Sequence, residues 1–511
     1  MDVTTITNYL VDGGEFVEQE HIDTIKKLLA SDNDKEAALK NYFAQEFPDI
    51  DATAFFAKYY NEKPFEGKVS ILKSFEKTPK KRVVQDFVKH FTHRFKFMEN
   101  LLRNRSELQG LSSIARIKGK QDKEKVSCIA MVMEASDTKN GHRILTVEDM
   151  SGTIKVLINK DSPLLEESKE ILIDDIIGIT GTAGGDIIFS DSIIYPDVPL
   201  SKELKKSPYD NYAVFFSDIE FGSKEFLKRE FQRLILWLNG KMGTLEQRKV
   251  AKKVKYVVIT GDVVDGAGIY PGQEDDLEIP DVKKQYEQAA YYLSKIPKHI
   301  KIIVCAGNHD VGRIAEPQLP LPKDYAQSLW DLDNVIMVSN PAYLLLDKTE
   351  DFPGILLLMY HGGSLPWYAD NIPRIRAAGG QKCADDIMIA LLKRRHMAPA
   401  HGSYLYVPDP DEDALIIDPI PDIFVTGHIH RAQTKNYRNV TCINSSCWTA
   451  ITENQEKRGL EPQPGRAFVV SLKTREVKML NFSLVKDTKT VAEYRRAKAE
   501  LEERYAKKKE A

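Results

Sequence analysis

The side chains most able to do chemistry lie in five short polar segments that follow apolar runs in the second half of the chain. The segments are 217–220 (Ser-Asp-Ile-Glu), 261–265 (Gly-Asp-Val-Val-Asp), 307–310 (Gly-Asn-His-Asp), 359–363 (Met-Tyr-His-Gly-Gly) and 427–430 (Gly-His-Ile-His). One such segment is common in loops, because Gly, Asn and Asp favour turns. The ordered set is uncommon, and it supplies the carboxylate, amide and imidazole groups that a paired-metal hydrolase needs.

The candidate metal ligands are Asp218, Glu220, Asp262, Asn308, His361, His428 and His430. Oxygen ligands of this kind suit manganese, magnesium or iron better than copper. Asp262 follows a glycine that lets the backbone turn tightly, and its two carboxylate oxygens can bridge two ions. Two divalent ions about 3.5–4 Å apart can activate a water and clamp the attacking and leaving oxygens of a phosphoryl group. We therefore predict a two-metal site that cleaves phosphoesters.

His309 and Asp265 are the candidate catalytic residues. His309 immediately follows a predicted ligand and need not bind metal itself. Its imidazole can stabilise the charged transition state or protonate the leaving oxygen, with Asp265 orienting the ring. For each motif taken singly, a turn without a function is the alternative interpretation.

Short, largely β-branched apolar runs precede these segments and predict buried strands at 213–216, 254–259, 301–305, 355–358 and 423–425. Strands of a sheet covered on both faces have this composition. Between the first two, residues 224–238 place Leu227, Phe231 and Leu234 on one helical stripe. Polar groups at strand exits are where open α/β sheets bind ligands. We predict a layered α/β hydrolase domain over residues 208–485.

The order of these motifs resembles the calcineurin-like metallophosphoesterase superfamily. Within it, three segments resemble the small subunits of archaeal D-family DNA polymerases, which are similar to the B subunits of eukaryotic replicative polymerases. The segments are 217–218 (Ser-Asp) with 221–224 (Phe-Gly-Ser-Lys), 360–362 (Tyr-His-Gly) and 391–399 (Leu-Leu-Lys-Arg-Arg-His-Met-Ala-Pro). The resemblance covers roughly residues 115–485, and it implies a calcineurin-like α/β/β/α domain.

The resemblance also implies roles for the residues. Asp218 and His430 would hold one metal, and Asn308, His361 and His428 the other. Asp262 would bridge the two ions, and His309 would be the catalytic histidine. The family's activity is a manganese-favouring 3′–5′ exonuclease that proofreads beside a large polymerase subunit. We therefore expect two divalent ions, manganese first, with magnesium or iron as the alternatives. The expected partners are a large polymerase subunit, DNA with single-stranded 3′ ends, and the sliding clamp through the holoenzyme.

Glu220 departs from the family pattern, which usually has a histidine there. Three ligand carboxylates against two divalent ions leave a site charge of about +1 instead of about +2, which weakens the pull on an anionic phosphate. Glutamate remains a competent oxygen ligand, so we expect metal binding with slower or more manganese-dependent cleavage. Two other functions stay open: a non-catalytic assembly subunit on the same fold, and a free-standing phosphatase or phosphodiesterase.

The rest of the chain predicts four further regions. Residues 1–60 form a helical module, with helices at 17–29 and 34–47 and a third segment rich in Asp, Ala and Phe, which binds a partner or caps the terminus. Residues 61–118 form a basic linker, partly helical at 84–104. Residues 119–200 contain glycine turns typical of hairpins, which predict a small antiparallel barrel, an OB-fold with a protein-contact role. Residues 486–511 form a charged C-terminal helix that frays or docks on a partner.

Composition bounds the class of protein. Lys and Arg number 72 against 75 Asp and Glu, for a net charge of −3, so any DNA contact must come from local patches or a partner. Five cysteines without a CxxC pair indicate reduced intracellular thiols. No apolar run approaches a membrane span of about 20 residues, and no secretory pattern begins the chain. We expect a soluble cytoplasmic protein without membrane contact.

Two features have two interpretations each. Residues 393–396 (Lys-Arg-Arg-His) follow an apolar helix, and they either steer the DNA backbone or complement the helix dipole. Trp367 and Tyr368 follow the predicted ligand His361, and they either stack a terminal base or pack in the core.

Overall fold

Six stretches of the chain are described by this computed structural model: residues 3–12, 15, 17–30, 35–50, 67–77 and 80–510. They divide into two units, Met1–Glu66 and Gly67–Ala511. Within these stretches, no helix has the length and apolar character that spanning a membrane requires.

The described residues of the first unit contain three short helices: α1 (Val3–Asp12), α2 (Gln19–Ala30) and α3 (Lys35–Glu46). Their apolar sides meet in a core formed by Ile6, Leu10, Ile25, Leu39, Phe43 and Phe47. The predicted helices at 17–29 and 34–47 are confirmed, whereas α1 was not predicted. The third predicted segment lies outside the described residues.

Two six-stranded sheets form the centre of the second unit. The first has the order β10-β9-β8-β7-β16-β17, and the second β1-β11-β12-β13-β15-β14. The first sheet contains β7 (Tyr212–Phe216), β8 (Val254–Thr260), β9 (Lys301–Cys305), β10 (Val335–Met337), β16 (Arg466–Ser471) and β17 (Val477–Asn481). The second contains β1 (Val69–Ser74), β11 (Ala342–Leu346), β12 (Ile355–Met359), β13 (Ile423–Thr426), β14 (Gln433–Tyr437) and β15 (Val440–Asn444). All five strands predicted from the sequence are present.

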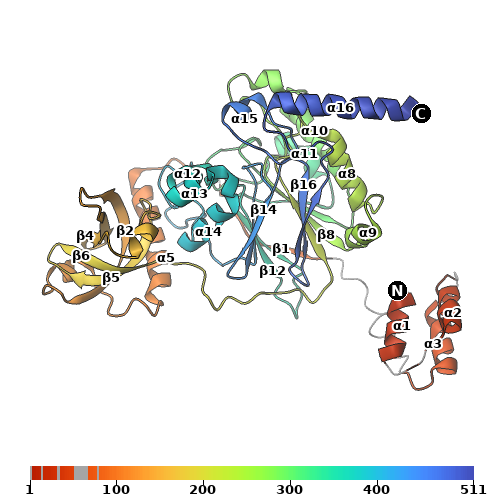
Figure 1. The fold of residues 1–511 in the computed structure, drawn as a ribbon, viewed down its shortest axis with the longest axis horizontal. Coiled ribbons are helices and arrows are strands. Elements are labelled where there is room, and N and C mark those ends of the chain that lie inside the picture. Colours follow the sequence, from red (N-terminus) through yellow and green to blue (C-terminus); the bar gives the residue numbers. More distant parts are fainter. Residues whose placement is uncertain are drawn as a thin grey trace. The chain divides into compact units, whose positions relative to one another are not determined.

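Side chains that alternate along the strands pack one face of each sheet against the other sheet and the opposite face against helices. In β7, Ala213 and Phe215 pack between the two sheets, whereas Val214 and Phe216 pack under helices. A strand with both faces buried must be apolar throughout, which is why these runs do not alternate with polar residues. Helices cover the outer face of each sheet (Figure 1). The predicted layered α/β/β/α arrangement is therefore confirmed.

The helices on the first sheet are α8 (Lys228–Leu238), α9 (Leu245–Lys252), α10 (Val282–Leu293) and α11 (Lys323–Trp330). Those on the second are α12 (Leu365–Asn371), α13 (Pro373–Ala377) and α14 (Ala384–Arg394). Further helices are η1 (Gln273–Asp276), η2 (Gly380–Cys383), α15 (Glu453–Lys457) and α16 (Val491–Glu510). The predicted stripe is confirmed, since Leu227, Phe231 and Leu234 are buried, although α8 begins at Lys228 rather than at 224.

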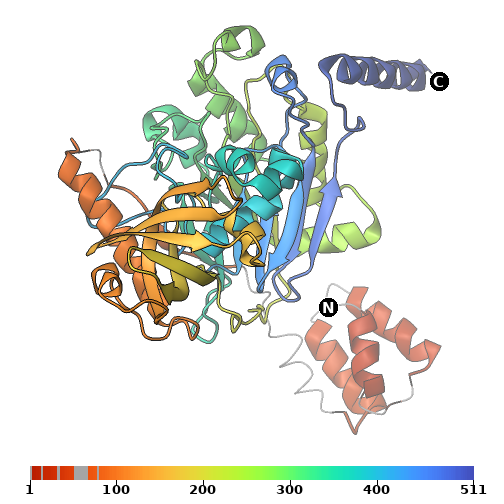
Figure 2. The ribbon, with the colours of Figure 1, turned by 60° about the vertical axis from the view of Figure 1, so that its left-hand side comes forward.

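A closed barrel of five strands lies between β1 and β7 in the chain (Figure 2). Its strand order is β2-β3-β4-β6-β5. Its strands are β2 (Lys125–Asp137), β3 (Arg143–Asp149), β4 (Gly152–Ile158), β5 (Ile176–Ala183) and β6 (Ile187–Ile194), with α6 (Ile114–Lys118) before them and α7 (Leu164–Ser168) after β4. The glycine turns of this region, at 140–141, 151–152 and 184–185, connect strands that pair antiparallel. The barrel is not wholly antiparallel, however, because β4 pairs with β6 in parallel.

The predicted basic linker contains more structure than the sequence indicated. Its β1 pairs with β11 and extends the second sheet, so this part of the prediction was wrong. The helix predicted at 84–104 is confirmed as α5 (Val84–Arg103). One face of α5 is not solvated, because Phe95, Met98 and Leu102 are buried against residues of the barrel.

Buried ion pairs connect α5 and the barrel to the sheets. Arg94 of α5 donates to Asp413 at 2.6 Å, and His396 contacts the same carboxylate at 3.0 Å. Arg394 donates to Asp175 of the barrel at 2.8 Å. The interpretation of 393–396 as a DNA-steering patch is thus wrong for Arg394, Arg395 and His396, which are buried.

We predict a pH-dependent stability from His396. Burial, with Arg94 as the next cause, lowers its pKa to about 4. An unfolded histidine titrates near pH 6.5, so from about pH 6.5 down to 4 the unfolded chain binds a proton that the folded chain does not, and up to about 3 kcal/mol of stability is lost as pH falls. Thermal unfolding of the chain and of a His396→Gln variant between pH 7 and 4.5 tests this. Parallel losses in both would contradict it.

Candidate metal centre

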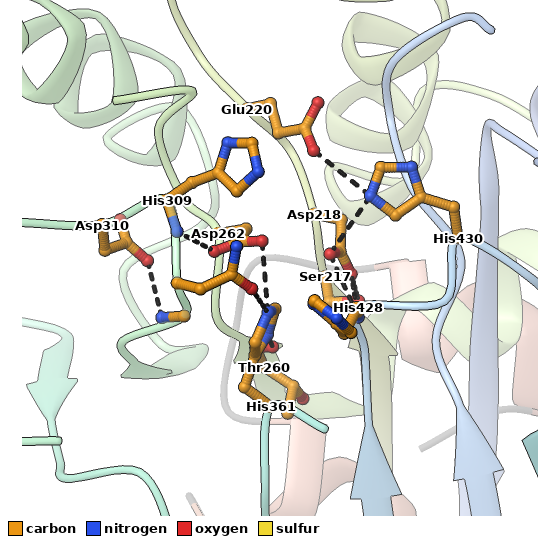
Figure 3. A network of polar contacts seen from close by, with 12 residues as sticks. Ser217, Asp218, Glu220, Thr260, Asp262, His309, Asp310, His361, His428 and His430 are labelled. Carbon is orange, nitrogen blue, oxygen red and sulfur yellow. Dashed lines mark hydrogen bonds and ion pairs between the residues drawn. The ribbon is translucent and has the colours of Figure 1, made fainter. Parts of the chain in front are cut away.

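Loops at the carboxyl ends of five strands carry all the predicted site residues. The loops follow β7, β8 and β9 of the first sheet and β12 and β13 of the second. Within each sheet these strands run parallel, so their carboxyl ends share one edge. The loops from both sheets converge there (Figure 3).

Left-handed backbone conformations aim several of these side chains. The residues with positive φ are Asp218 (50°), Glu220 (52°), Asp262 (49°), His428 (66°) and His430 (56°). Such conformations cost a non-glycine residue of order 1–3 kcal/mol and cluster at functional sites. Asp218 and Glu220 lie beyond the end of β7, so these conformations, and not the alternation of side chains along a strand, bring the two carboxylates together.

One group of possible ligands surrounds His361. Its Nδ1 lies 2.9 Å from the Thr260 carbonyl oxygen, which can only accept, so Nδ1 carries a proton. Its Nε2 faces the Asp262 carboxylate at 3.2 Å and the Asn308 amide oxygen at 3.0 Å. His428 joins Asp262 and His361, with ligand atoms that all lie within 4.8 Å of one another. Such converging lone pairs require a cation or a proton between them, so the residues fit a divalent ion.

A second group forms around His430. Its Nε2 lies 3.3 Å from Asp218 Oδ1 and 3.2 Å from Glu220 Oε1 (Figure 3). The Ser217 hydroxyl and the His428 backbone N–H hold the Asp218 carboxylate in place. The Glu220 carboxylate therefore lies where it can bind the same ion as Asp218 and His430. These three side chains fit a second divalent ion.

His309 lies beside both groups. Its backbone N–H donates to Asp262 at 2.8 Å. Its Nδ1 contacts the Asp265 carbonyl oxygen at 2.9 Å and the Asp265 carboxylate at 3.3 Å. One ligand atom each of His309, Glu220 and Asp262 lie within 4.8 Å of one another. The predicted contact between Asp265 and the His309 ring is thus present in the structure.

Excess negative charge dominates the electrostatics. Burial opposes protonation of His309, but Asp262, the hydrogen bond to Asp265 and Glu220 outweigh it and raise its pKa to about 10. Burial likewise opposes protonation of His361, yet Asp262 raises its pKa to about 9. Burial and the neighbouring His361 instead lower the pKa of His428 to about 3, so that it stays neutral. Without metal, protons supply the positive charge that the carboxylates require.

Two buried residues that the prediction did not single out hold the loops together. Asp310 accepts hydrogen bonds from the N–H groups of Val263 (3.1 Å) and Gly307 (3.0 Å) and from the Tyr286 hydroxyl (3.0 Å). Asn340 accepts the backbone N–H of His361 at 2.8 Å. Asp310 is the last residue of the Gly-Asn-His-Asp motif at 307–310, so the sequence could have indicated its role. Asn340 lies in none of the five motifs, so nothing in the sequence indicated its role.

A cavity of about 300 Å³ opens over both groups. Its described lining includes Tyr270, Gln381, Asn454, Gln455 and Arg458 as well as the site residues Glu220, Asp262, Asp265, Asn308, His309, His428 and His430. Trp367 and Tyr368 do not line it. Tyr368 is fully buried, and its hydroxyl accepts the Ala400 N–H at 2.9 Å, which confirms core packing for that residue.

Comparisons with known proteins identify relatives of this chain. The calcineurin-like phosphoesterase family model matches residues 213–432. The chain is 38% identical over 401 residues to the DNA polymerase II small subunit of Methanothermobacter thermautotrophicus, covering 78% of this chain and 80% of that one. It is 41% identical over 386 residues to the subunit of the same name from Archaeoglobus fulgidus, covering 76% and 75%. For Thermoplasma acidophilum the identity is 36% over 405 residues, covering 78% of each.

We predict that Asp310→Ala destabilises the second unit. The variant leaves three buried N–H groups (those of Val263, Val264 and Gly307) and the Tyr286 hydroxyl without their acceptor, at a cost of roughly 1–3 kcal/mol for each unpaired group. Urea or thermal denaturation measures the loss, with Asp275→Ala, an exposed acidic residue, as the matched control expected to stay within about 0.5 kcal/mol. Equal stabilities of the two variants would contradict a bracing role.

Proposed function

The chain belongs to the family of DNA polymerase II small subunits, and from this premise we propose that it is a metal-dependent 3′–5′ exonuclease acting beside a large polymerase subunit. The convergence of Asp262, Asn308, His361 and His428 beside Asp218, Glu220 and His430 is the observation that carries the proposal. A purely architectural subunit has no physical need to bury so many ionisable groups around a cavity.

Divalent metal, when bound by the two ligand groups, supplies positive charge that activates water and stabilises the phosphoryl oxygens. Asp262 belongs to the first group, and one of its ligand atoms lies within 4.8 Å of one of Glu220 in the second, so it would help to hold metal in both. The Thr260 carbonyl and the Asn340 side chain fix the orientation of His361. These contacts hold the ligands before substrate arrives, which is what electrostatic catalysis requires.

His309 is the proposed catalytic residue. Its Nδ1–H is held by the Asp265 carbonyl oxygen, so Nε2 is the nitrogen available to a substrate in the cavity. In its cationic state, Nε2–H would donate a hydrogen bond to the phosphate and transfer its proton to the leaving oxygen. Asp265 acts through the ring and is a positioning residue.

The substrate follows from the size and charge of the site. A cavity of about 300 Å³ is at the small end for ligand sites, and it suits a terminal nucleotide of a single strand better than a duplex. With a net charge of −3, the chain has no general attraction for DNA. A partner that binds the DNA, namely the large polymerase subunit, would therefore speed the reaction by holding the 3′ end near the site.

The barrel is proposed to be an OB-fold that contacts the partner. Its strands follow the order 1-2-3-5-4 around the barrel, and a short helix, α7, stands between the third and fourth strands, as in that class. Exposed apolar side chains at Met133, Met150 and Phe189 favour contact with protein over contact with nucleic acid.

The purified chain with manganese should shorten a 5′-labelled single-stranded oligonucleotide stepwise from its 3′ end. Loss of a general acid typically costs 10²–10⁴-fold, so we expect His309→Ala to slow the ladder by about that factor. His401→Ala, an exposed histidine outside the cavity, should behave like the unchanged chain. Intact DNA in all three samples, or release of the labelled 5′ nucleotide first, would contradict the proposal.

Glu220→His should raise the cleavage rate and reduce the preference for manganese over magnesium, because it removes one negative charge beside the phosphate. Glu220→Gln removes the same charge without adding an imidazole, so it separates charge from ligand type. Rates are compared over a metal titration with each ion. If Glu220→His leaves both the rate and the metal preference unchanged, the charge argument is wrong.

A further inference from the structure

The outer ring nitrogen of His430 has a partner that the sequence motifs do not include. Gln455, in the short helix α15, places its Nε2 2.9 Å from His430 Nδ1. The other ring nitrogen, Nε2, faces Asp218 and Glu220. Hydrogen bonds at one imidazole nitrogen decide what the other can do, because a neutral ring carries only one proton.

The orientation of the Gln455 amide is fixed by the start of α15. Its Oε1 accepts the backbone N–H of Thr452 at 3.1 Å, and the Thr452 hydroxyl accepts the Gln455 N–H at 3.3 Å, which together form a capping box. A backbone N–H can only donate, so the oxygen of the amide must face it. The NH₂ group therefore faces His430 Nδ1, and it can donate to that nitrogen only when the nitrogen carries no proton.

A metal at this position needs the lone pair on Nε2, so the proton of the neutral ring then stands on Nδ1, where it faces the Gln455 NH₂ group. Gln455 would then have to turn its oxygen to His430 and give up the Thr452 N–H. His361 needs no such change, because its Nδ1 already donates to the Thr260 carbonyl oxygen.

We propose that Gln455 is a positioning residue that makes the Asp218–Glu220–His430 position the weaker of the two metal positions. This rests on the proposed function only in requiring that both positions bind divalent metal. The Asp262–Asn308–His361–His428 position is built to bind first, and the other fills at higher metal concentration.

Gln455→Glu is the informative variant. One carboxylate oxygen keeps the Thr452 N–H, so the capping box is preserved, while the other accepts a hydrogen bond from His430 Nδ1–H and leaves the Nε2 lone pair free for metal. Outer-sphere partners of this kind change metal affinity by about 10–100-fold. Asn454→Asp adds the same charge to the same cavity from the neighbouring residue, without being a partner of the His430 ring, and is the matched control.

Manganese binding to the metal-free full chain, followed by calorimetry and by the loss of the free-ion EPR signal, provides the test. We expect two affinities at least tenfold apart in the unchanged chain. Gln455→Glu should tighten the weaker one at least about tenfold and leave the stronger one unchanged, while Asn454→Asp should keep the two far apart. Thermal unfolding without metal verifies that each variant folds.

Two results would overturn the inference: equal affinities in the unchanged chain, or a weaker site that Gln455→Glu does not tighten beyond Asn454→Asp. Neither depends on DNA cleavage. A chain that binds manganese with these affinities but leaves DNA intact would contradict the proposed nuclease alone. A chain that binds no manganese would contradict both the metal centre and the role of Gln455.

Discussion

The repulsion between buried carboxylates is the constraint on which this structure depends. Asp218, Glu220, Asp262 and Asp265 are all at most 5% exposed, and no lysine lines the described part of their cavity. Charges this close in a poorly hydrated region cannot all be negative unless positive charge lies between them. Imidazolium groups supply it without metal, as the raised pKa of His309 and of His361 indicates. Divalent metal would do so more effectively.

The scaffold is built to hold that unfavourable arrangement. Two sheets packed face to face bring the strand ends together, and Asp310 and Asn340 brace the loops through backbone N–H groups. The strained conformations at Asp218 and His430 persist because the packed strands behind them leave little alternative. Stability is thus given up at the site and recovered in the apolar layers.

Much of this organisation could be predicted from the sequence, and the exceptions have physical reasons. Continuous apolar runs such as 301–305 are strong signals, because a strand buried on both faces admits few other residues. The interpretation of Arg394 and Arg395 as part of a DNA-steering patch was wrong. Sequence cannot distinguish a solvated cation from one that is buried and paired with an acid, as Arg394 is with Asp175. Contacts such as Gln455 with His430 depend on tertiary packing and leave no local pattern.

Anomalous scattering at the manganese edge, from crystals of the full chain grown with manganese, tests the central claim most directly. A paired-metal centre predicts two peaks, one among Asp262, Asn308, His361 and His428, and one beside Asp218, Glu220 and His430. An empty pocket at saturating manganese would contradict it. The buried carboxylates would then be balanced by protons alone.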